Sequence, residues 1–380
     1  MKLNLNIEPL ENWLTANNQP LLISGPCSAE TEDQLLTTAH LLAATGKVSV
    51  LRAGIWKPRT RPGEFEGIGS IGLEWLKRAK AETGLPTAVE VANAKHVEEA
   101  LAAGVDILWI GARSTVNPFT VQEIADALKG HDVPVLIKNP VNPDLQLWIG
   151  AIERINKAGI SKIGAIHRGF SSFEKSSFRN EPMWELAIQL KTLCPDLPII
   201  NDPSHICGNR ELIPYISQKA LDLDMQGLMI ESHLDPSVAW TDAKQQLTPA
   251  AVSELMDRLT VREPESKNEA FVDKLAELRK QIDKIDDLLL QKLGERMSIV
   301  EKIGEFKRDN QVTVLQVSRW DEILKKGTAF AKALKLDELF TEKFLELVHG
   351  ESIRKQTEIL NAGKVTKEGI AAEQHTEVKA

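Results

Sequence analysis

Eight short runs of apolar and β-branched residues alternate with helical stretches up to about residue 260, and no other feature of the sequence restricts the fold as much. The runs lie at residues 21–24, 48–51, 87–90, 106–110, 134–138, 162–166, 198–201 and 227–230. Amphipathic segments such as 73–82 and 94–103 separate them. Eight such units in about 250 residues are typical of an α/β fold of the (β/α)8 TIM barrel type. A doubly wound open sheet is the competing fold, but no GxGxxG motif follows the first run.

The residues that close the predicted strands are mostly charged or able to bind a metal. They are Gly25-Pro26-Cys27, Arg52, Glu90, Arg113, Lys138, His167-Arg168, Asp202-Pro203-Ser204-His205 and Glu231-Ser232-His233. The carboxyl ends of barrel strands form the active-site face. Surface loops would not place polar groups so regularly, so we interpret these residues as an active-site rim.

Four residues of this rim form a candidate metal site. Cys27, His205 and Glu231 follow strands one, seven and eight, which become neighbours when the barrel closes, and Asp242 follows Glu231 by eleven residues. A thiolate, an imidazole and two carboxylates suit a divalent ion such as manganese, iron, cobalt or zinc that polarises a carbonyl group. A single buried cysteine or histidine is more often structural, and we assign Cys207 and His233 to that class.

Cations form the second group on the rim. They are Arg52, Lys57, Arg59, Arg113, Lys138 and Arg168. The loop around Lys57-Pro58-Arg59 could by itself be a solvated basic turn. Six cations at one barrel mouth would repel each other unless anions bind, so we expect substrates with more than one phosphate or carboxylate. Glu90 is a candidate for proton handling or for orienting a water, and its alternative role is to pair with one of these cations.

Composition restricts the partners and the compartment. The net charge of −8 argues against a general nucleic-acid surface. Three cysteines do not form a disulfide framework. We find no signal-peptide pattern and no apolar run near 18 residues, so we expect a cytoplasmic protein that does not span a membrane.

The pattern changes after residue 262, where residues 263–269 form a polar linker. Apolar residues then recur at helical spacing and predict three helices, at about 271–307, 318–333 and 337–360. A three-helix domain of residues 270–360 is too thin to bury a full core by itself. We therefore expect it to form a dimer through its long helix, and a higher oligomer is the alternative to a dimer. A plain coiled-coil tail is the alternative. Residues 361–380 are polar and small, and we expect them to be disordered.

The barrel motifs resemble those of the short form of 3-deoxy-D-arabino-heptulosonate-7-phosphate (DAHP) synthase, which has no N-terminal regulatory domain and catalyses the first step of the shikimate pathway of aromatic amino acid biosynthesis. They are Gly25-Pro26-Cys27-Ser28, Lys57-Pro58-Arg59-Thr60, Ile110-Gly111-Ala112-Arg113, Lys138-Asn139, His167-Arg168-Gly169, Asp202-Pro203-Ser204-His205 and Ile230-Glu231-Ser232-His233. Related octulosonate 8-phosphate synthases have an asparagine-containing sequence in place of Lys57-Pro58-Arg59-Thr60.

This resemblance implies condensation of phosphoenolpyruvate with erythrose 4-phosphate. It assigns one divalent metal ion, with manganese preferred over cobalt, iron and zinc, to Cys27, His205, Glu231 and Asp242. It assigns phosphoenolpyruvate to Arg52, Lys57, Arg113, Lys138 and Arg168, and erythrose 4-phosphate to Arg59 and Thr60. Lys138 and Glu90 are the candidates for catalysis.

The C-terminal helices resemble the all-helical class of chorismate mutase, which converts chorismate to prephenate without a cofactor. The matching positions are Arg279, Arg296, Lys307, Arg319, Ser352 and Gln356. Arg279 and Lys307 are 28 residues apart, or about 42 Å along one helix. They cannot reach one small dicarboxylate in the same chain, so Arg279 must serve a partner's pocket. Lys307 and Gln356 are the catalytic candidates at the breaking ether bond.

Two positions depart from this resemblance. The mutase family usually has acidic residues where Gln316 and Trp320 stand, and these contact the substrate hydroxyl. Gln316 can still accept a hydrogen bond, whereas Trp320 cannot. A domain that only binds chorismate or prephenate, and thereby regulates the barrel allosterically, is therefore the alternative to an active mutase.

Overall fold

The computed structural model describes residues 3–14, 20–59, 61, 63–173 and 176–362, and it divides into two compact units, Met1–Pro264 and Glu265–Ala380. The first unit is a closed barrel in which each strand pairs in parallel with the next and β8 pairs with β1. The strands are β1 (Leu21–Gly25), β2 (Val50–Ala53), β3 (Thr87–Val91), β4 (Ile107–Ile110), β5 (Val135–Lys138), β6 (Ile163–His167), β7 (Ile199–Asn201) and β8 (Gly227–Glu231). The predicted (β/α)8 fold is confirmed.

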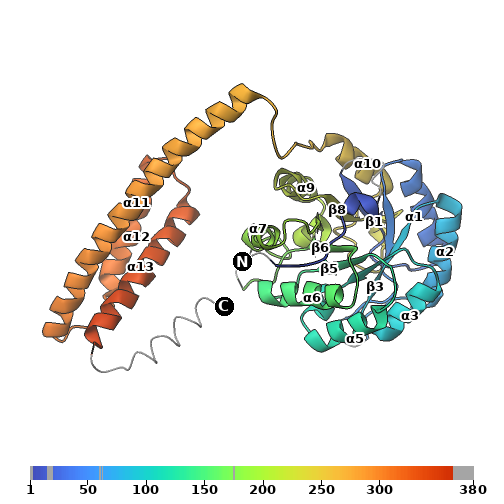
Figure 1. Ribbon diagram of the computed structural model, residues 1–380, viewed down its shortest axis with the longest axis horizontal. Coiled ribbons are helices and arrows are strands. Elements are labelled where there is room, and N and C mark those ends of the chain that lie inside the picture. The colour runs from blue at the N-terminus through green and yellow to red at the C-terminus, as the bar shows by residue number, and fades with distance from the viewer. Residues whose placement is uncertain (1–2, 15–19, 60, 62, 174–175, 363–380) are drawn as a thin grey trace. The chain divides into compact units, whose positions relative to one another are not determined.

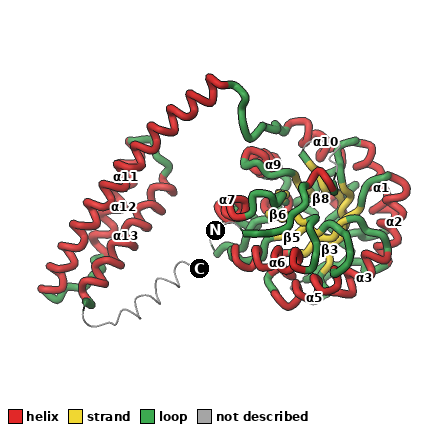
Figure 2. Tube along the Cα trace, in the orientation of Figure 1, coloured by secondary structure: helices red, strands yellow, loops and turns green. Residues whose placement is uncertain are grey.

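Helices surround the strands, as Figures 1 and 2 show. They are α1 (Glu32–Ala44), α2 (Ile71–Thr83), α3 (Ala94–Ala102), α4 (Ala112–Thr115), α5 (Pro118–Leu128), α6 (Leu145–Lys157), α7 (Trp184–Leu193), α8 (Pro203–Cys207), α9 (Ile213–Asp222) and α10 (Pro249–Arg258), with 3-10 turns η1 (Leu10–Asn12) and η2 (Pro236–Val238). Several begin where the sequence supplies a cap. Thr31, Asn93 and Asp144, for example, each accept a hydrogen bond from a backbone N–H in the first turn.

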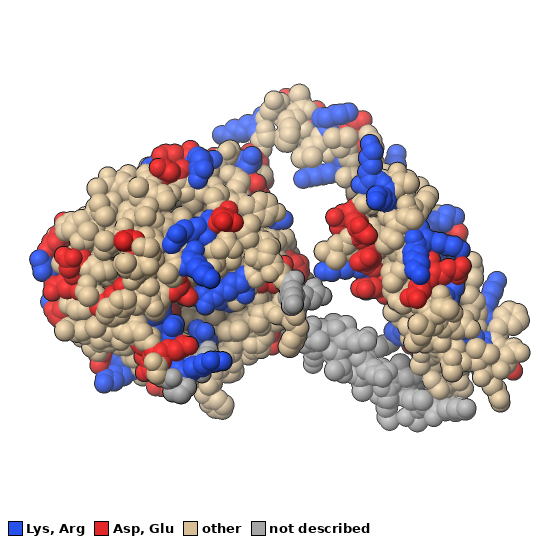
Figure 3. Space-filling view, turned by 180° about the vertical axis from the view of Figure 1, so that it is seen from behind, with Lys and Arg blue, Asp and Glu red and all other residues tan. Residues whose placement is uncertain are grey.

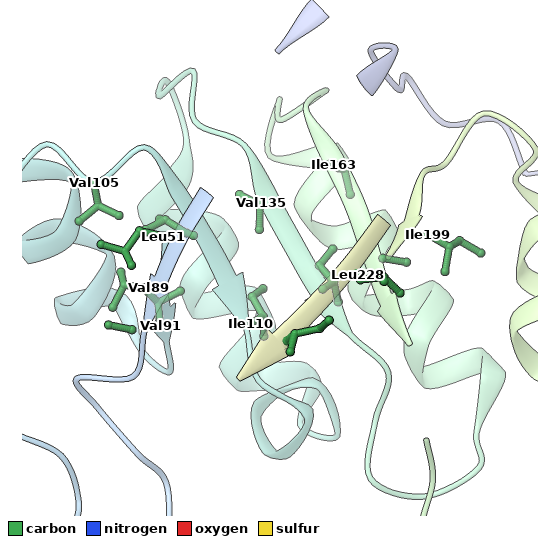
Figure 4. Packing of buried hydrophobic residues seen from close by; sticks show 14 of the residues in the cluster. Leu51, Val89, Val91, Val105, Ile110, Val135, Ile163, Ile199 and Leu228 are labelled. Atoms are coloured by element: carbon green, nitrogen blue, oxygen red, sulfur yellow. The ribbon is translucent and has the colours of Figure 1, made fainter. Parts of the chain in front are cut away.

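The strands separate two hydrophobic layers because successive side chains point to opposite faces. One layer lies between strands and helices, and Figure 4 shows part of it, including Val89, Ile110 and Leu228. The other fills the barrel interior with residues such as Ile23, Trp109 and Met229. Leu14 is buried in this inner layer, with Leu10 and Trp13 packed against it, so the segment before β1 contributes to the barrel core.

The second strand begins two residues later than predicted. The run at 48–51 was expected to end before Arg52, but β2 spans Val50–Ala53, so Arg52 lies within the strand. The backbone N–H of Ser49 already donates to the carbonyl of Leu22, and the paired ladder starts at Ile23 and Val50. This register places the Arg52 side chain in the barrel interior, beside Trp109.

The second unit contains three helices, α11 (Glu269–Asp309), α12 (Val317–Ala333) and α13 (Glu338–Leu360). These agree with the three predicted helices. In the long helix α11 only Val300 and Gly304 are buried among the described residues. The predicted tail at 361–380 lies outside the described residues from 363 onward. Within the described parts of the chain, no helix is both long and apolar enough to cross a membrane.

Candidate active sites

The alternation of strand side chains carries charged residues from the barrel interior to its mouth. In β2, β3 and β5 the inward apolar residues are Val50, Ala88 and Leu136, and the next inward positions are Arg52, Glu90 and Lys138. Arg168, Asp202 and Glu231 stand two residues after Ile166, Ile200 and Met229 in the same way. The apolar core therefore ends in a charged layer at the carboxyl ends of the strands.

One cavity joins most of the predicted synthase residues. Its lining is Cys27, Arg52, Gly54, Trp56, Lys57, Pro58, Arg59, Glu90, Arg113, Lys138, Arg168, Arg179, His205 and Asp242. Seven of these side chains are lysine or arginine and two are carboxylates, so the cavity is suited to anions. Figure 3 shows lysine and arginine side chains gathered near the middle of one face of the barrel.

Three of the four predicted metal ligands form one cluster at this cavity, and the fourth, His205, lies beside Glu231. Candidate ligand atoms of Cys27, Glu231 and Asp242 all lie within 4.8 Å of one another. Cys27 Sγ is 3.4 Å from Asp242 Oδ2, and His205 Nε2 is 3.7 Å from Glu231 Oε1. The buried Glu231 Oε1 has no hydrogen-bond partner among the described residues. Its nearest charged neighbours are Arg52 Nη2 at 3.4 Å and the His205 ring, and a buried carboxylate beside a thiol and an imidazole fits a divalent cation.

Neighbouring cations favour the ionised forms of the candidate metal ligands Cys27 and Asp242. Burial, followed by the charge of Glu231, raises the pKa of the Cys27 thiol to about 12. Lys57 acts in the opposite direction, because its Nζ lies 2.8 Å from Cys27 Sγ. Burial also opposes ionisation of Asp242, but Arg179, His205 and Lys57 together lower its pKa to about 2. A bound cation would favour the thiolate further.

Hydrogen bonds connect the segment after β1 to the segment after β8, which carry Cys27 and Asp242 respectively. Cys27 N donates to Gln246 Oε1 at 3.0 Å, and the hydroxyl groups of Ser28 and Thr241 lie 2.6 Å apart. We call these two contacts, together with a third between Glu30 and Trp240, the loop clamp. In that third contact, Trp240 N donates to Glu30 Oε1 at 2.7 Å.

Gly25, at the end of β1, allows the segment that carries Cys27 to run close to β2. Gly25 has a φ of +153°, and a Cβ at this position would lie 2.0 Å from the carbonyl oxygen of Arg52. Any other residue would force the Cys27 segment away from its neighbour.

Lys138 is held by the carboxylate of Asp202, a rim residue to which the sequence alone assigned no specific role. Lys138 Nζ lies 2.8 Å from Asp202 Oδ2, and Asp202 also accepts at 3.0 Å from the ring nitrogen Nδ1 of His205. Although burial opposes ionisation, His205 and Lys138 hold the pKa of Asp202 well below its ordinary value. Asp202 therefore orients a predicted metal ligand and a predicted substrate-binding cation. The signals in the sequence were its position after β7 and its place in the motif Asp202-Pro203-Ser204-His205.

Arg52 and Glu90 meet at Trp109. The guanidinium of Arg52 lies 4.9 Å from the ring centre of Trp109, and the indole N–H of Trp109 donates to Glu90 Oε2 at 3.0 Å. Two guanidinium nitrogens of Arg52, Nε and Nη1, are buried and have no hydrogen-bond partner in the described chain. Glycine at 111 leaves room for the carboxylate, since a Cβ there would lie 2.1 Å from Glu90 Oε1. Arg52 thus retains donors for a ligand.

Arg168 and Arg179 complete the cationic side of the cavity. Arg168 donates to Asn180 Oδ1 at 2.8 Å, and burial lowers its pKa to about 10. Arg179 donates to Asp242 Oδ1 at 2.9 Å and to Gln245 Oε1 at 2.8 Å. Sequence reasoning missed Arg179 because it follows no strand directly and belongs to no recognised motif.

The remaining predicted synthase residues are Arg59, Thr60 and Arg113, and the two that the structure describes lie at the outer edge of the cavity. Arg113 is exposed but lines the cavity, and Arg59 Nε is 3.0 Å from Glu64. Trp56 follows β2 and stacks on His96 with ring centres 4.0 Å apart. Thr60 lies outside the described residues.

The helical unit brings several predicted mutase residues together between α11 and α13. Arg296 donates to Ser352 Oγ at 2.6 Å, and Lys307 donates to the carbonyl of Val314. Ser352 and Gln356 are buried. Gln356 Oε1 has no hydrogen-bond partner among the described residues, so this acceptor atom is available to a ligand.

Three predicted mutase residues are not gathered there. Arg279 lies near the start of α11, on the same continuous helix as Lys307. Gln316 is an exposed residue that precedes α12, and Arg319 is exposed and pairs with Glu322 on its own helix. A single copy of the described chain therefore holds only part of the predicted site.

Comparisons with known proteins match the barrel and the helical unit to two different families. Residues 5–266 match the DAHP synthetase I family, and residues 278–357 match chorismate mutase type II. A phospho-2-dehydro-3-deoxyheptonate aldolase of Thermotoga maritima is 34% identical over 238 residues, which cover 63% of this chain and 68% of that protein.

Two further similarities concern the barrel. A 2-dehydro-3-deoxyphosphooctonate aldolase of Thioalkalivibrio sulfidiphilus is 27% identical over 66% of this chain and 92% of its own length. A crystal structure of the Thermotoga maritima DAHP synthase has a TM-score of 0.57 at 32% identity, covering 62% of this chain and 67% of that one.

Proposed function

Because the chain belongs to the DAHP synthetase I family and carries a chorismate mutase type II domain, we propose that its barrel condenses phosphoenolpyruvate with erythrose 4-phosphate, which forms DAHP and phosphate. The observation that carries this proposal is the cavity that joins seven cations to a mixed thiol, imidazole and carboxylate cluster. Two phosphorylated substrates need the cations. Three free cysteines agree with the expected cytoplasmic location.

The assignment of the two substrate ends follows the family resemblance, and the cationic lining of the cavity supports it. Arg52, Lys57, Arg113, Lys138 and Arg168 bind phosphoenolpyruvate, and Arg59 with Thr60 binds the phosphate of erythrose 4-phosphate. A divalent ion, with manganese preferred over cobalt, iron and zinc, would be held by Cys27, His205, Glu231 and Asp242, where it would supply a Lewis acid for the aldehyde carbonyl. The cations place C3 of phosphoenolpyruvate against that carbonyl carbon.

Glu90 and Lys138 act where water adds. After the carbon–carbon bond forms, a water molecule adds at C2 and phosphate leaves from the resulting hemiketal. Trp109 fixes one oxygen of Glu90, so the other can accept a proton from that water. Asp202 holds Lys138 in place, so that its ammonium group can stabilise the negative charge that develops on the leaving phosphate.

Metal removal tests the synthase proposal. We expect chelated protein to lose synthase activity and to regain it with manganese, and Cys27→Ala to lose both metal binding and turnover. The matched control is Cys207→Ala, which removes another buried cysteine that does not line the cavity. Full activity and unchanged metal binding in Cys27→Ala would exclude this metal site.

For the helical unit we propose rearrangement of chorismate to prephenate. Arg296 neutralises a carboxylate, and Lys307 with Gln356 stabilises the ether oxygen as its bond breaks. The buried Gln356 without a hydrogen-bond partner in the described chain supports a ligand at this position.

A second copy of the chain completes the mutase pocket. Leu278, Ile282, Ile285 and Leu289 follow a four-three-four spacing on α11 and are 45–56% exposed. This stripe matches the seam of paired helices. We propose that α11 of a second copy covers it, which brings Arg279 of the partner subunit to the pocket.

Absorbance of chorismate tests the mutase proposal. Wild type should consume chorismate, Arg296→Ala should lose most of this activity, and the exposed Arg308→Ala on the same helix should keep it. A protein that leaves chorismate untouched, but whose synthase activity is slowed by prephenate, would instead have a purely regulatory helical domain.

A further inference from the structure

A histidine that neither motif includes lies on the same helix as the proposed mutase residues. His349 precedes Ser352 by three residues and Gln356 by seven, so the three side chains share one side of α13. The imidazole stacks on the indole of Trp320 in α12, with ring centres 4.2 Å apart and an interplanar angle of 14°. This stacking restricts the orientation of the imidazole ring.

The outer ring nitrogen of His349 has an unused hydrogen-bonding position. Nε2 is buried and has no hydrogen-bond partner among the described residues, and the same is true of Gln356 Oε1 two turns further along. Buried polar atoms are nearly always paired in native proteins. Two such atoms on one side of α13, next to the Arg296–Ser352 contact, indicate that a polar ligand supplies the missing partners.

The charges around His349 decide which ligand group suits it. Burial, then the positive charges of Arg296 and Lys307 on α11, lower the pKa of His349, while α12 contributes the uncharged Trp320. The imidazole is therefore neutral at pH 7. A neutral ring adds little to the binding of a carboxylate, which Arg296 already serves. It suits a hydroxyl group, which can donate to one tautomer or accept from the other.

We propose that His349 Nε2 forms a hydrogen bond with the ring hydroxyl group of chorismate, and that the stacked Trp320 holds the imidazole in position for this contact. The proposal rests on the mutase function proposed above and adds a residue that recognises the hydroxyl of the substrate. His349 is then a specificity-determining residue of the pocket.

This contact is tested in the full-length protein by a double-mutant-type cycle, in which the residue and the substrate are changed separately and together. The residue is changed by His349→Phe, which keeps an aromatic ring on Trp320 but removes both nitrogens. The substrate is changed to a chorismate analogue that lacks the ring hydroxyl. The measurement is kcat/KM for all four combinations, or Kd by calorimetry where a ligand binds without turnover. His40→Phe, at an exposed histidine of the barrel, is the matched control.

Wild type should prefer chorismate over the analogue, and His349→Phe should reduce that preference about tenfold, the factor expected for one hydrogen bond. His349→Gln, which retains a hydrogen-bonding amide, should restore part of it. If His349 had a purely structural role, His349→Phe would lower kcat/KM equally for chorismate and for the analogue. The preference would then be unchanged, and this result would overturn the proposal. If His349→Phe does not fold, His349→Leu replaces it in the cycle.

The wild-type arm separates this inference from the function on which it rests. A wild type that neither consumes nor binds chorismate refutes the proposed mutase function and the His349 contact together. A wild type that consumes chorismate, with a preference that His349→Phe leaves intact, refutes only the contact.

Discussion

At the scale of single residues, the barrel mouth depends on buried groups whose neighbours determine their charge. His167, which the sequence placed on the rim, is an example: it is fully buried and faces the helix layer, beside Phe170 and Trp184. Its Nε2 lies 2.6 Å from the carbonyl oxygen of Pro182, and its Nδ1 accepts at 3.0 Å from the amide nitrogen of Asn201. The carbonyl requires a proton on Nε2, so the neutral tautomer satisfies both nitrogens. Burial is the main cause that lowers the pKa of His167 to about 4.

This shift predicts a loss of barrel stability in mild acid. Below the ordinary histidine pKa of 6.5 the unfolded chain binds a proton that the native His167 does not bind until about pH 4. Stability therefore falls as the pH drops through this range, by about 1.4 kcal/mol per pH unit. At pH 5 the cost is about 2 kcal/mol relative to neutral pH.

The comparison is with His167→Gln, which cannot titrate. The variant should be less stable than wild type at pH 7, but its urea midpoint should fall less between pH 7 and pH 5. An equal fall in both proteins would show that His167 does not cause the acid sensitivity.

At the scale of elements, the loop clamp joins the segments that carry the proposed metal ligands Cys27 and Asp242. Asp242 has a φ of +49°, a left-handed conformation that is costly for a residue other than glycine. Such a conformation persists only where surrounding contacts enforce it. The bond from Trp240 N to Glu30 Oε1 lies two residues before Asp242 and is one of these contacts. Glu30 also lies 3.4 Å from the buried ring of His233.

We expect Glu30→Ala to weaken metal binding although Glu30 is no ligand. Losing the contact frees the loop before Asp242, and removal of such supporting contacts typically weakens metal affinity about 10- to 100-fold. The measurement is competition with a chelator, together with the melting temperature of the metal-free protein. The exposed Glu82→Ala serves as control, since its partners Arg78 and His40 lie away from the cavity. Unchanged affinity in Glu30→Ala would exclude a positioning role for the clamp.

At the scale of the whole molecule, the proposed dimer assigns two arginines of the same helix, α11, to different mutase pockets. Arg279 and Arg296 lie on one helix and, in the proposed dimer, serve different pockets. Mixing Arg279→Ala with Arg296→Ala protomers therefore produces a heterodimer in which one pocket carries both changes and the other carries neither.

Random exchange of the two inactive variants should restore about a quarter of the wild-type mutase activity, because half of the dimers are mixed and each has one intact pocket. Mutase activity is measured before and after the exchange, and synthase activity provides the internal control. No recovery, with exchange shown by a size tag on one variant, would contradict a pocket shared between two copies.

Periodicity in the sequence was sufficient to predict the fold. Eight apolar runs separated by amphipathic segments predict a parallel barrel, because period two and period 3.6 place side chains on definite faces. The same reasoning located Arg52, Lys138 and Glu231, since strand ends converge at one face of any such barrel. The predicted start of β2 was wrong by two residues, because the pairing with β1 determines where this strand begins and the local composition does not.

Only the folded chain decided which side chains meet. Asp202 pairs with Lys138 across 64 residues, and Arg179 reaches Asp242 across 63. No local pattern encodes such contacts, because they depend on barrel closure and on the path of the loops. The stacking of Trp320 on His349 belongs to the same class, since it depends on how α12 packs on α13. Local sequence thus determines the elements and the kinds of side chain at their ends, and long-range packing decides distances, partners and protonation.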